Sequence, residues 1–127
     1  MSFMALRRRK GSRAHALGVR AEQAACAALA REGWAVLARR LRTEAGELDV
    51  LAERDGILAI IEVKARPTLA DAAAALSQRQ QARLLAAAEI VLAAHPDWGA
   101  NGVRFDLLVV DAAGAVRRIS DAFRVEA

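Results

Sequence analysis

Residues 46–66 read GELDVLAERDGILAIIEVKAR, two apolar-rich runs separated by an Asp55-Gly56 pair. An Asp-Gly pair between such runs is the strongest short-range signal for a β-hairpin, because both residues tolerate the positive φ angles of a tight turn. A two-residue turn also sets the register of the two strands. It places Asp49 directly opposite Glu62, with both side chains on one face of the hairpin.

Two carboxylates that face each other repel, and this hairpin surrounds them with apolar residues. The face opposite to them is expected to consist of Leu48, Val50, Ala52, Ala59, Ile61 and Val63. A divalent cation would remove the repulsion, and Mg²⁺ favours one or two carboxylates together with water and phosphate oxygens. The alternative is structural: Glu47, which the register puts opposite Lys64, forms a cross-strand ion pair with it while Asp49 and Glu62 lie exposed.

Hydrophobic periodicity predicts the other elements of the chain. The expected order is a helix over 16–31, strands over 34–41, 47–53 and 57–65, a helix over 77–94, and strands over 103–111 and 116–119. Ser77 and Gln80 form a capping-box pattern at the start of the second helix, and Thr68 is a candidate cap for a further helical stretch over 69–76. This order predicts an α/β fold in which helices flank a mixed β-sheet.

Length and composition exclude several classes of protein. The chain has 127 residues, which is room for one domain, and its hydrophobic fraction of 55% is ample for a core. No apolar run approaches the roughly 18 residues of a membrane span, and the N-terminus lacks the apolar stretch of a signal peptide. A single cysteine, Cys26, excludes an intramolecular disulfide framework. We therefore expect a soluble, cytoplasmic protein with no membrane partner.

The formal net charge of +4 is distributed unevenly along the chain. Residues 1–20 contain six basic side chains and no acidic ones. We expect residues 1–15 to form a basic, flexible arm and residues 16–127 to form a single domain. Such an arm can neutralise the phosphates of a nucleic acid, and the alternatives are a solvated tail or an arginine-rich transit peptide.

Lysine is rare in this chain. Of the 19 basic residues only Lys10 and Lys64 are lysines, and Lys64 lies inside an apolar strand. Lysine supplies a compact charge whose pKa can shift, which arginine does not. Next to carboxylates that hold a metal, it would contact the scissile phosphate or lower the pKa of an attacking water.

Asp49, followed after twelve residues by Glu62-Val63-Lys64, resembles the D…(D/E)xK signature of restriction-endonuclease-like nucleases. The other motifs are Gly18…Glu22, Gly46-Glu47-Leu48-Asp49-Val50, Ile61-Glu62-Val63-Lys64-Ala65-Arg66 and Arg104-Phe105-Asp106. Together, over nearly the whole chain, they resemble the YraN-like family of bacterial proteins, which is similar in fold to archaeal Holliday-junction resolvases. The resemblance implies a restriction-endonuclease-like fold.

The resemblance also implies an active-site set of Glu22, Asp49, Glu62 and Lys64. Asp49 and Glu62 would hold Mg²⁺ or Mn²⁺, with the Val63 carbonyl as a further ligand. Lys64 would stabilise the phosphate or position water, and Glu22 would support the metal or the lysine.

A second group of residues is expected to contact nucleic acid: Arg39, Arg42, Arg66 and Gln80. Members of the family usually carry a lysine where this chain has Gln80, and glutamine can orient a water or a phosphate oxygen but adds no charge. Arg39, Arg40 and Arg42 precede the hairpin and would grip a phosphodiester backbone; a solvated strand end is the alternative.

Some conspicuous residues have a structural interpretation. Arg104 and Asp106 are expected to form an ion pair on one strand face, and Cys26 is expected to lie in the core. Trp34 and Trp98 are expected to pack rather than to stack on bases, because the chain offers no aromatic platform.

The predicted function is Mg²⁺-dependent hydrolysis of phosphodiester bonds in DNA, including structured or branched DNA. The expected partner is nucleic acid, with DNA favoured, and a homodimer is left open. The alternatives are a non-catalytic nucleic-acid-binding protein that keeps the nuclease fold, and a scaffold whose acids serve only folding.

Overall fold

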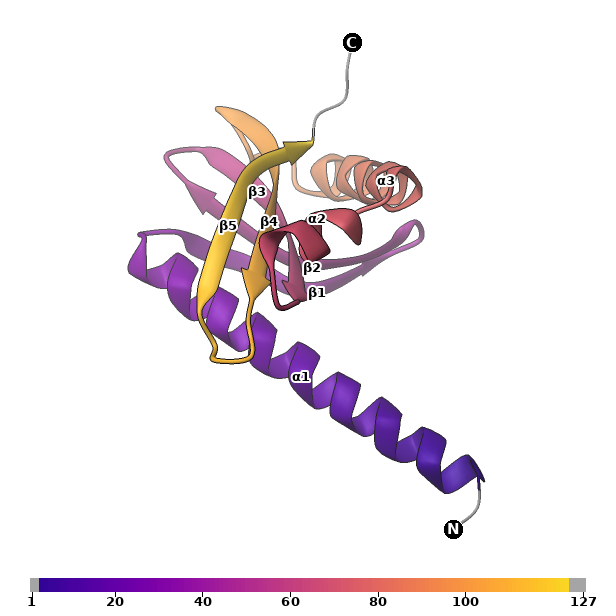
Figure 1. Ribbon diagram of the computed structural model, residues 1–127. Helices are drawn as coiled ribbons and strands as arrows, with labels where there is room; N and C mark the ends of the chain where they lie inside the picture. The colour runs from indigo at the N-terminus through magenta and orange to yellow at the C-terminus, as the bar shows by residue number, and fades with distance from the viewer. Residues whose placement is uncertain (1–2, 124–127) are drawn as a thin grey trace.

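The computed structural model describes the backbone of residues 3–123 and the side chains of residues 16–123. Its elements are α1 (Phe3–Arg31), β1 (Ala35–Thr43), β2 (Gly46–Arg54), β3 (Ile57–Ala65), α2 (Leu69–Ala74), α3 (Gln78–Ala94), β4 (Gly102–Val110) and β5 (Val116–Phe123). The strands form one sheet in the order β1-β2-β3-β4-β5, with β3 and β4 parallel and the other neighbours antiparallel. The expected α/β fold, a mixed sheet flanked by helices, is confirmed, and it is consistent with the restriction-endonuclease-like fold (Figure 1).

The hairpin of β2 and β3 forms as its sequence predicts. Asp55 and Gly56 have φ angles of 54° and 75°, so both turn residues are left-handed. From this turn the strands pair in the predicted register, from Arg54 opposite Ile57 to Val50 opposite Ile61.

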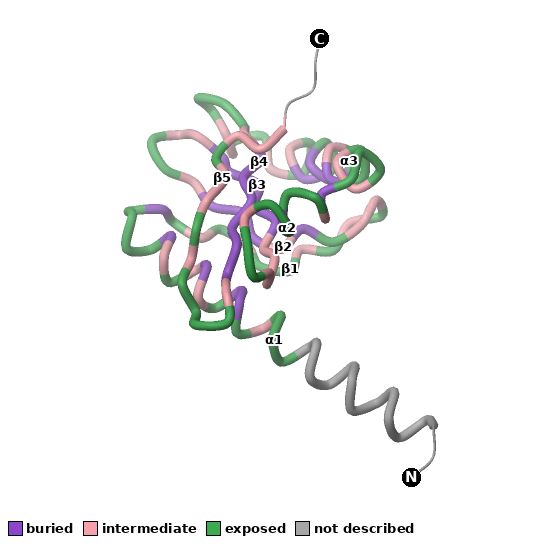
Figure 2. Tube along the Cα trace, in the orientation of Figure 1, coloured by how far each residue is buried: buried purple, intermediate pink, exposed green. Residues whose placement is uncertain are grey.

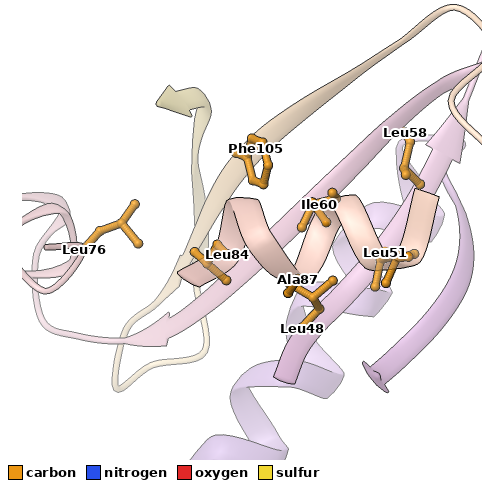
Figure 3. Close-up of a cluster of buried hydrophobic side chains, with 10 residues drawn as sticks. Leu48, Leu51, Leu58, Ile60, Leu76, Leu84, Ala87 and Phe105 are labelled. Atoms are coloured by element: carbon orange, nitrogen blue, oxygen red, sulfur yellow. The ribbon is translucent and has the colours of Figure 1, made fainter. Parts of the chain in front are cut away.

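The two faces of the sheet are covered by different helices. On one face, Ala25 and Leu29 of α1 pack against Val50, Ile61 and Leu108. The opposite face packs against α3, and its largest buried cluster includes Leu48, Leu51, Leu58, Ile60, Leu84, Ala87 and Phe105 (Figure 3). Buried positions are concentrated in the central strands and on the helix sides that face them (Figure 2).

The face predicted for Leu48 is wrong. Strict alternation puts Leu48 and Val50 on one face, but Leu48 packs in the cluster under α3 and Val50 in the cluster under α1. Between Leu48 and Val50 lies Asp49, and Arg40 is opposite it on β1. Arg40 has a positive φ of 49°. The strand geometry is therefore irregular at this level of the sheet, and side-chain alternation does not continue through it.

Most element boundaries lie within two residues of the prediction, and two differ by more. Helix α1 begins at Phe3 rather than at residue 16; the side chains of residues 3–15 lie outside the described ones, so the role of the basic arm stays a prediction. Strand β5 extends to Phe123, which pairs with Phe105, instead of ending at residue 119. Pairing with β4 extends this strand through a stretch that lacks a strand pattern of its own.

The predicted helix caps are confirmed. Thr68 accepts a hydrogen bond from the amide of Asp71 and begins α2, and Ser77 accepts one from the amide of Gln80 and begins α3. Of the helices in the described part of the chain, none combines the length and the apolar character needed to cross a membrane.

Candidate active site

The candidate site lies where β2 and β3 separate. Val50 and Ile61 are the last paired residues of these strands. One residue further, Asp49 Oδ2 accepts a hydrogen bond of 2.9 Å from the amide nitrogen of Val63. Where the backbone pairing of β2 and β3 ends, this side-chain hydrogen bond connects the two strands. It holds the Asp49 side chain beside the Glu62-Val63-Lys64 segment.

Glu62 is buried, with 7% of its surface exposed. Its Oε2 accepts a hydrogen bond of 2.8 Å from Gln80 Nε2 and lies 3.4 Å from Lys64 Nζ. Burial and the neighbouring Asp49 carboxylate raise the pKa of Glu62 to about 7, against the lowering effect of Lys64. The two carboxylates thus interact, as the hairpin register predicts, and the alternative in which both lie exposed is wrong for Glu62.

Helix α3 places Gln80 against this carboxylate. Ser77 Oγ accepts a hydrogen bond of 3.2 Å from the amide of Gln80, which fixes the first turn of α3 next to β3. The Gln80 side chain then donates to Glu62. Its observed contact is therefore with the candidate site itself, and its contact with nucleic acid stays a prediction.

The predicted ion pair between Glu47 and Lys64 is wrong. Lys64 pairs with Glu62 on its own strand, and Glu47 lies 3.6 Å from Arg42 Nε on β1. The reason is the end of the β2–β3 ladder at Val50, beyond which the register no longer holds residues 47 and 64 opposite each other.

Glu22 brings α1 to the same edge of the sheet. It is buried, with 6% of its surface exposed, and its two oxygens accept hydrogen bonds from Arg39 Nε at 3.2 Å and Arg40 Nε at 2.9 Å. The partners of Glu22 are thus two arginines, whereas Lys64 pairs with Glu62. The geometry supports Glu22 as a residue of the site but not as the support of the lysine.

A cleft of about 470 Å³ opens beside Asp49 on the side of α1. Its lining is Gly18, Val19, Glu22, Arg40, Arg42, Glu47, Asp49 and Val63. The cleft therefore combines two arginines with three carboxylates, a surface that can bind a phosphate next to an acidic centre. Arg66 lies outside this lining, and its Nη1 donates to the carbonyl of Ala65.

The donor set fits a hard divalent cation. Asp49 and Glu62 supply two interacting carboxylates, and Val63, whose carbonyl the resemblance implies as a further ligand, lines the same cleft as Asp49. Among the residues that the structure describes, no three His, Cys, Asp or Glu side chains form a metal-binding group. This set suits Mg²⁺, which keeps several waters and needs only one or two carboxylates from the protein.

The structural interpretations of Arg104, Asp106, Trp34 and Trp98 are confirmed. Arg104 Nη2 lies 2.8 Å from Asp106 Oδ2 in an ion pair whose carboxylate is buried. Trp34 is buried, with the guanidinium of Arg54 4.8 Å from its ring centroid, and Trp98 stacks on a histidine ring and packs against the core. Cys26, expected in the core, is only half-buried at its edge, where it packs against the cluster under α1, and burial raises the pKa of its thiol.

The contact between Glu22 and Arg40 is the main feature of the site that the sequence did not predict. In a regular strand Arg39 and Arg40 point to opposite faces, so only one of them would reach α1. The left-handed conformation of Arg40 brings both to Glu22. The sequence does not indicate this left-handed conformation, because arginine is not a residue type associated with positive φ.

Comparison with known proteins places these residues in a family. The family model described as uncharacterised protein family UPF0102 matches residues 21–110. A UPF0102 protein of Granulibacter bethesdensis is 60% identical over 117 residues, which cover 92% of this chain and 74% of that protein. One of Azorhizobium caulinodans is 45% identical over 119 residues, covering 94% and 91%. The chain therefore belongs to the UPF0102 family, which is the YraN-like family that its motifs resemble.

Proposed function

We propose that this protein is a Mg²⁺-dependent nuclease that hydrolyses phosphodiester bonds in DNA. One observation carries the proposal: Asp49 and Glu62 interact at the open end of the hairpin, with Lys64 beside them and an arginine-lined cleft next to them. A buried carboxylate whose pKa is raised by burial and by a second carboxylate, beside a polar cleft, is typical of a functional site rather than of a structural ion pair.

Each residue of the site has a role in this proposal. Asp49 and Glu62 would hold the cation, with the Val63 carbonyl as a further ligand. When bound, Mg²⁺ polarises a phosphate oxygen and lowers the pKa of a bound water. Lys64, with 17% of its side chain exposed, reaches the site with a charge that stabilises the phosphate or orients water. Gln80 fixes the direction of the Glu62 carboxylate.

The reaction would be the addition of water across a phosphodiester. The water oxygen forms a new bond to phosphorus while one bond from phosphorus to a sugar oxygen breaks, and that oxygen takes up a proton. Arg39, Arg40 and Arg42 on β1 supply positive charge for the flanking phosphates. The likeness to Holliday-junction resolvases favours DNA, branched DNA included, and a homodimer stays a prediction.

A cleavage assay tests the proposal. The full chain is incubated with end-labelled single-stranded, duplex and four-way-junction DNA, in Mg²⁺, in Mn²⁺ and in EDTA. We expect cleavage of at least one substrate only with metal, and its loss in Asp49→Asn and in Glu62→Gln. Asp97→Asn, at an exposed acid far along the chain from the site, is the matched control. Equal cleavage by wild type and Asp49→Asn would point to a contaminating nuclease and contradict the proposal.

The second candidate is a non-catalytic nucleic-acid-binding protein. It is favoured by the contacts of Glu62, whose Oε2 already meets both Gln80 and Lys64, and by the shortage of a third acidic ligand among the described side chains. This candidate predicts DNA binding of equal strength with and without Mg²⁺, and no cleavage of any substrate in the same assay.

A further inference from the structure

We infer that Arg40 is a phosphate-binding residue of the cleft and that Glu22 is the positioning residue that holds it there. The inference rests on the proposed function and names the side chain that meets the DNA backbone next to the acidic centre. Arg40 lies on β1 opposite Asp49, since its neighbours Arg39 and Leu41 pair with Val50 and Leu48.

The backbone of Arg40 is strained. Its φ of 49° lies in the left-handed region, which costs a residue with a Cβ free energy and persists only where the surroundings impose it. In a regular strand Arg40 would point to the face opposite Arg39. The left-handed conformation turns it to the same side, toward α1 and the cleft. A strained residue in the wall of a polar cleft is typical of a binding site.

Glu22 is what holds Arg40 in this position. The buried carboxylate binds Nε of Arg40 at 2.9 Å and Nε of Arg39 at 3.2 Å, so one negative charge orients two positive ones. The pair of arginines keeps an excess of positive charge after Glu22 is neutralised. Glu22 therefore directs the guanidinium groups without cancelling their attraction for an anion.

The free side of the Arg40 guanidinium is suited to a phosphate. The contact with Glu22 uses Nε, and within residues 16–123 no protein acceptor is shown for its Nη groups. Its side chain is 41% exposed and lines the same cleft as Asp49. Two parallel N–H groups on a planar fork match two oxygens of a phosphate, which an ammonium group cannot do.

Binding of a labelled four-way DNA junction in EDTA tests this role without any cleavage. Arg40→Asn removes the guanidinium, and asparagine tolerates a positive φ, so the fold should be kept. We expect the affinity to fall about tenfold and the slope of log K against log salt to decrease by about one. Arg31→Asn removes the same charge from an exposed position at the end of α1 and should change the affinity at most about twofold. Arg40→Gly is the second variant, should the asparagine not fold.

Glu22→Gln separates positioning from mere structural support. It removes the charged anchor of Arg40 but raises the net charge by one. Because these two effects on binding oppose each other, the affinity for the junction in EDTA should change less than in Arg40→Asn, while cleavage in Mg²⁺ at saturating DNA falls at least tenfold. A loss of both affinity and cleavage, in parallel with a lower Tm, would show that Glu22 only supports the fold and would overturn its part of the inference.

A titration with inorganic phosphate gives a readout that does not depend on DNA or on activity. The Nε–Hε NMR resonance of Arg40, assigned by its disappearance in Arg40→Asn, should shift saturably with phosphate. If it does not shift, and Arg40→Asn binds the junction like Arg31→Asn, Arg40 is only a counterion of Glu22 and the inference fails even if wild type cleaves DNA. If it shifts and the junction data agree while wild type cleaves nothing, the phosphate site stands and the nuclease proposal fails.

Discussion

Asp106 and Glu62 are buried carboxylates on neighbouring central strands, one register position apart, yet their surroundings differ. Asp106 on β4 lies opposite Ile61, and its oxygens accept hydrogen bonds from the Arg104 guanidinium and from the amide of Asp121. Glu62 on β3 meets a neutral amide, a lysine at 3.4 Å and a second carboxylate, that of Asp49. The acid on β4 is neutralised by its surroundings, and the acid on β3 is not.

This difference separates a structural acid from a candidate functional one. A buried carboxylate that serves only the fold is stabilised when donors and a cation surround it, as around Asp106. Glu62 instead shares its environment with a like charge, which destabilises the metal-free protein at neutral pH. The predictions below test whether the two acids respond oppositely to the same changes.

The largest effect is expected at Asp106. Asp106→Ala leaves Arg104 without its buried partner and the amide of Asp121 without its acceptor, so we expect a loss of about 3 kcal/mol in the free energy of unfolding. For a domain of this size that lowers Tm by about 10 °C or more, measured by thermal denaturation. Asp97→Ala, at an exposed loop position, is the control and should change Tm by only a degree or two. A small effect at Asp106 would remove the contrast between the two acids.

Whereas the charged carboxylate of Asp106 is expected to stabilise the fold, ionisation of Glu62 should destabilise it, and the pH dependence of stability tests this. Its pKa is raised from 4.5 to about 7 in the folded state, so between these values the folded protein binds more protons than the unfolded one. The free energy of unfolding in EDTA should therefore fall as pH rises from about 4.5 to 7, by on the order of 2 kcal/mol, and level off above that. Urea denaturation of wild type and Glu62→Gln across this range measures it. Equal pH profiles for the two proteins would show that Glu62 does not titrate there.

A bound metal ion should remove the destabilising repulsion between the Asp49 and Glu62 carboxylates. Asp49→Asn keeps an oxygen for the amide of Val63 but removes the repulsion, so in EDTA it should melt higher than wild type. Mg²⁺ at about ten times its Kd should stabilise wild type by about 1.4 kcal/mol and Asp49→Asn by much less. If Asp49→Asn and Glu62→Gln both melt lower than wild type in EDTA, and neither Mg²⁺ nor Mn²⁺ stabilises wild type, the two carboxylates are structural.

The sequence predicted the regular end of the hairpin better than its open end. The Asp55-Gly56 turn determines the pairing as far as Val50 and Ile61, because both turn residues are typical of one turn type. Asp49 and Glu62 lie one residue beyond this ladder, and the hydrogen bond from the Val63 amide to Asp49 keeps the two acids close there.

Where local rules stop, the sequence could not predict the contacts. The face of Leu48 depends on the irregular backbone at Arg40. The partner of Glu47 depends on where the β2–β3 ladder ends, and the full length of β5 depends on pairing with β4. The packing of Leu48 under α3 and the pairing of β5 with β4 join residues far apart in the chain, so tertiary packing overrides local propensity there.

The smallest effect on stability is expected from exchanging the cation beside each acid. Arg104 donates to Asp106 from Nε and Nη2, so Arg104→Lys loses one of two hydrogen bonds and should lower the free energy of unfolding by about 1 kcal/mol without changing cleavage. Lys64→Arg keeps the charge beside Glu62 and should change Tm little. Its cleavage rate should fall at least tenfold, because a compact ammonium at 3.4 Å from Glu62 cannot be replaced by a planar fork without moving the charge. Thermal denaturation and single-turnover cleavage of the two variants measure both effects. A wild-type cleavage rate in Lys64→Arg would show that Lys64 acts only as a counterion, as Arg104 does for Asp106.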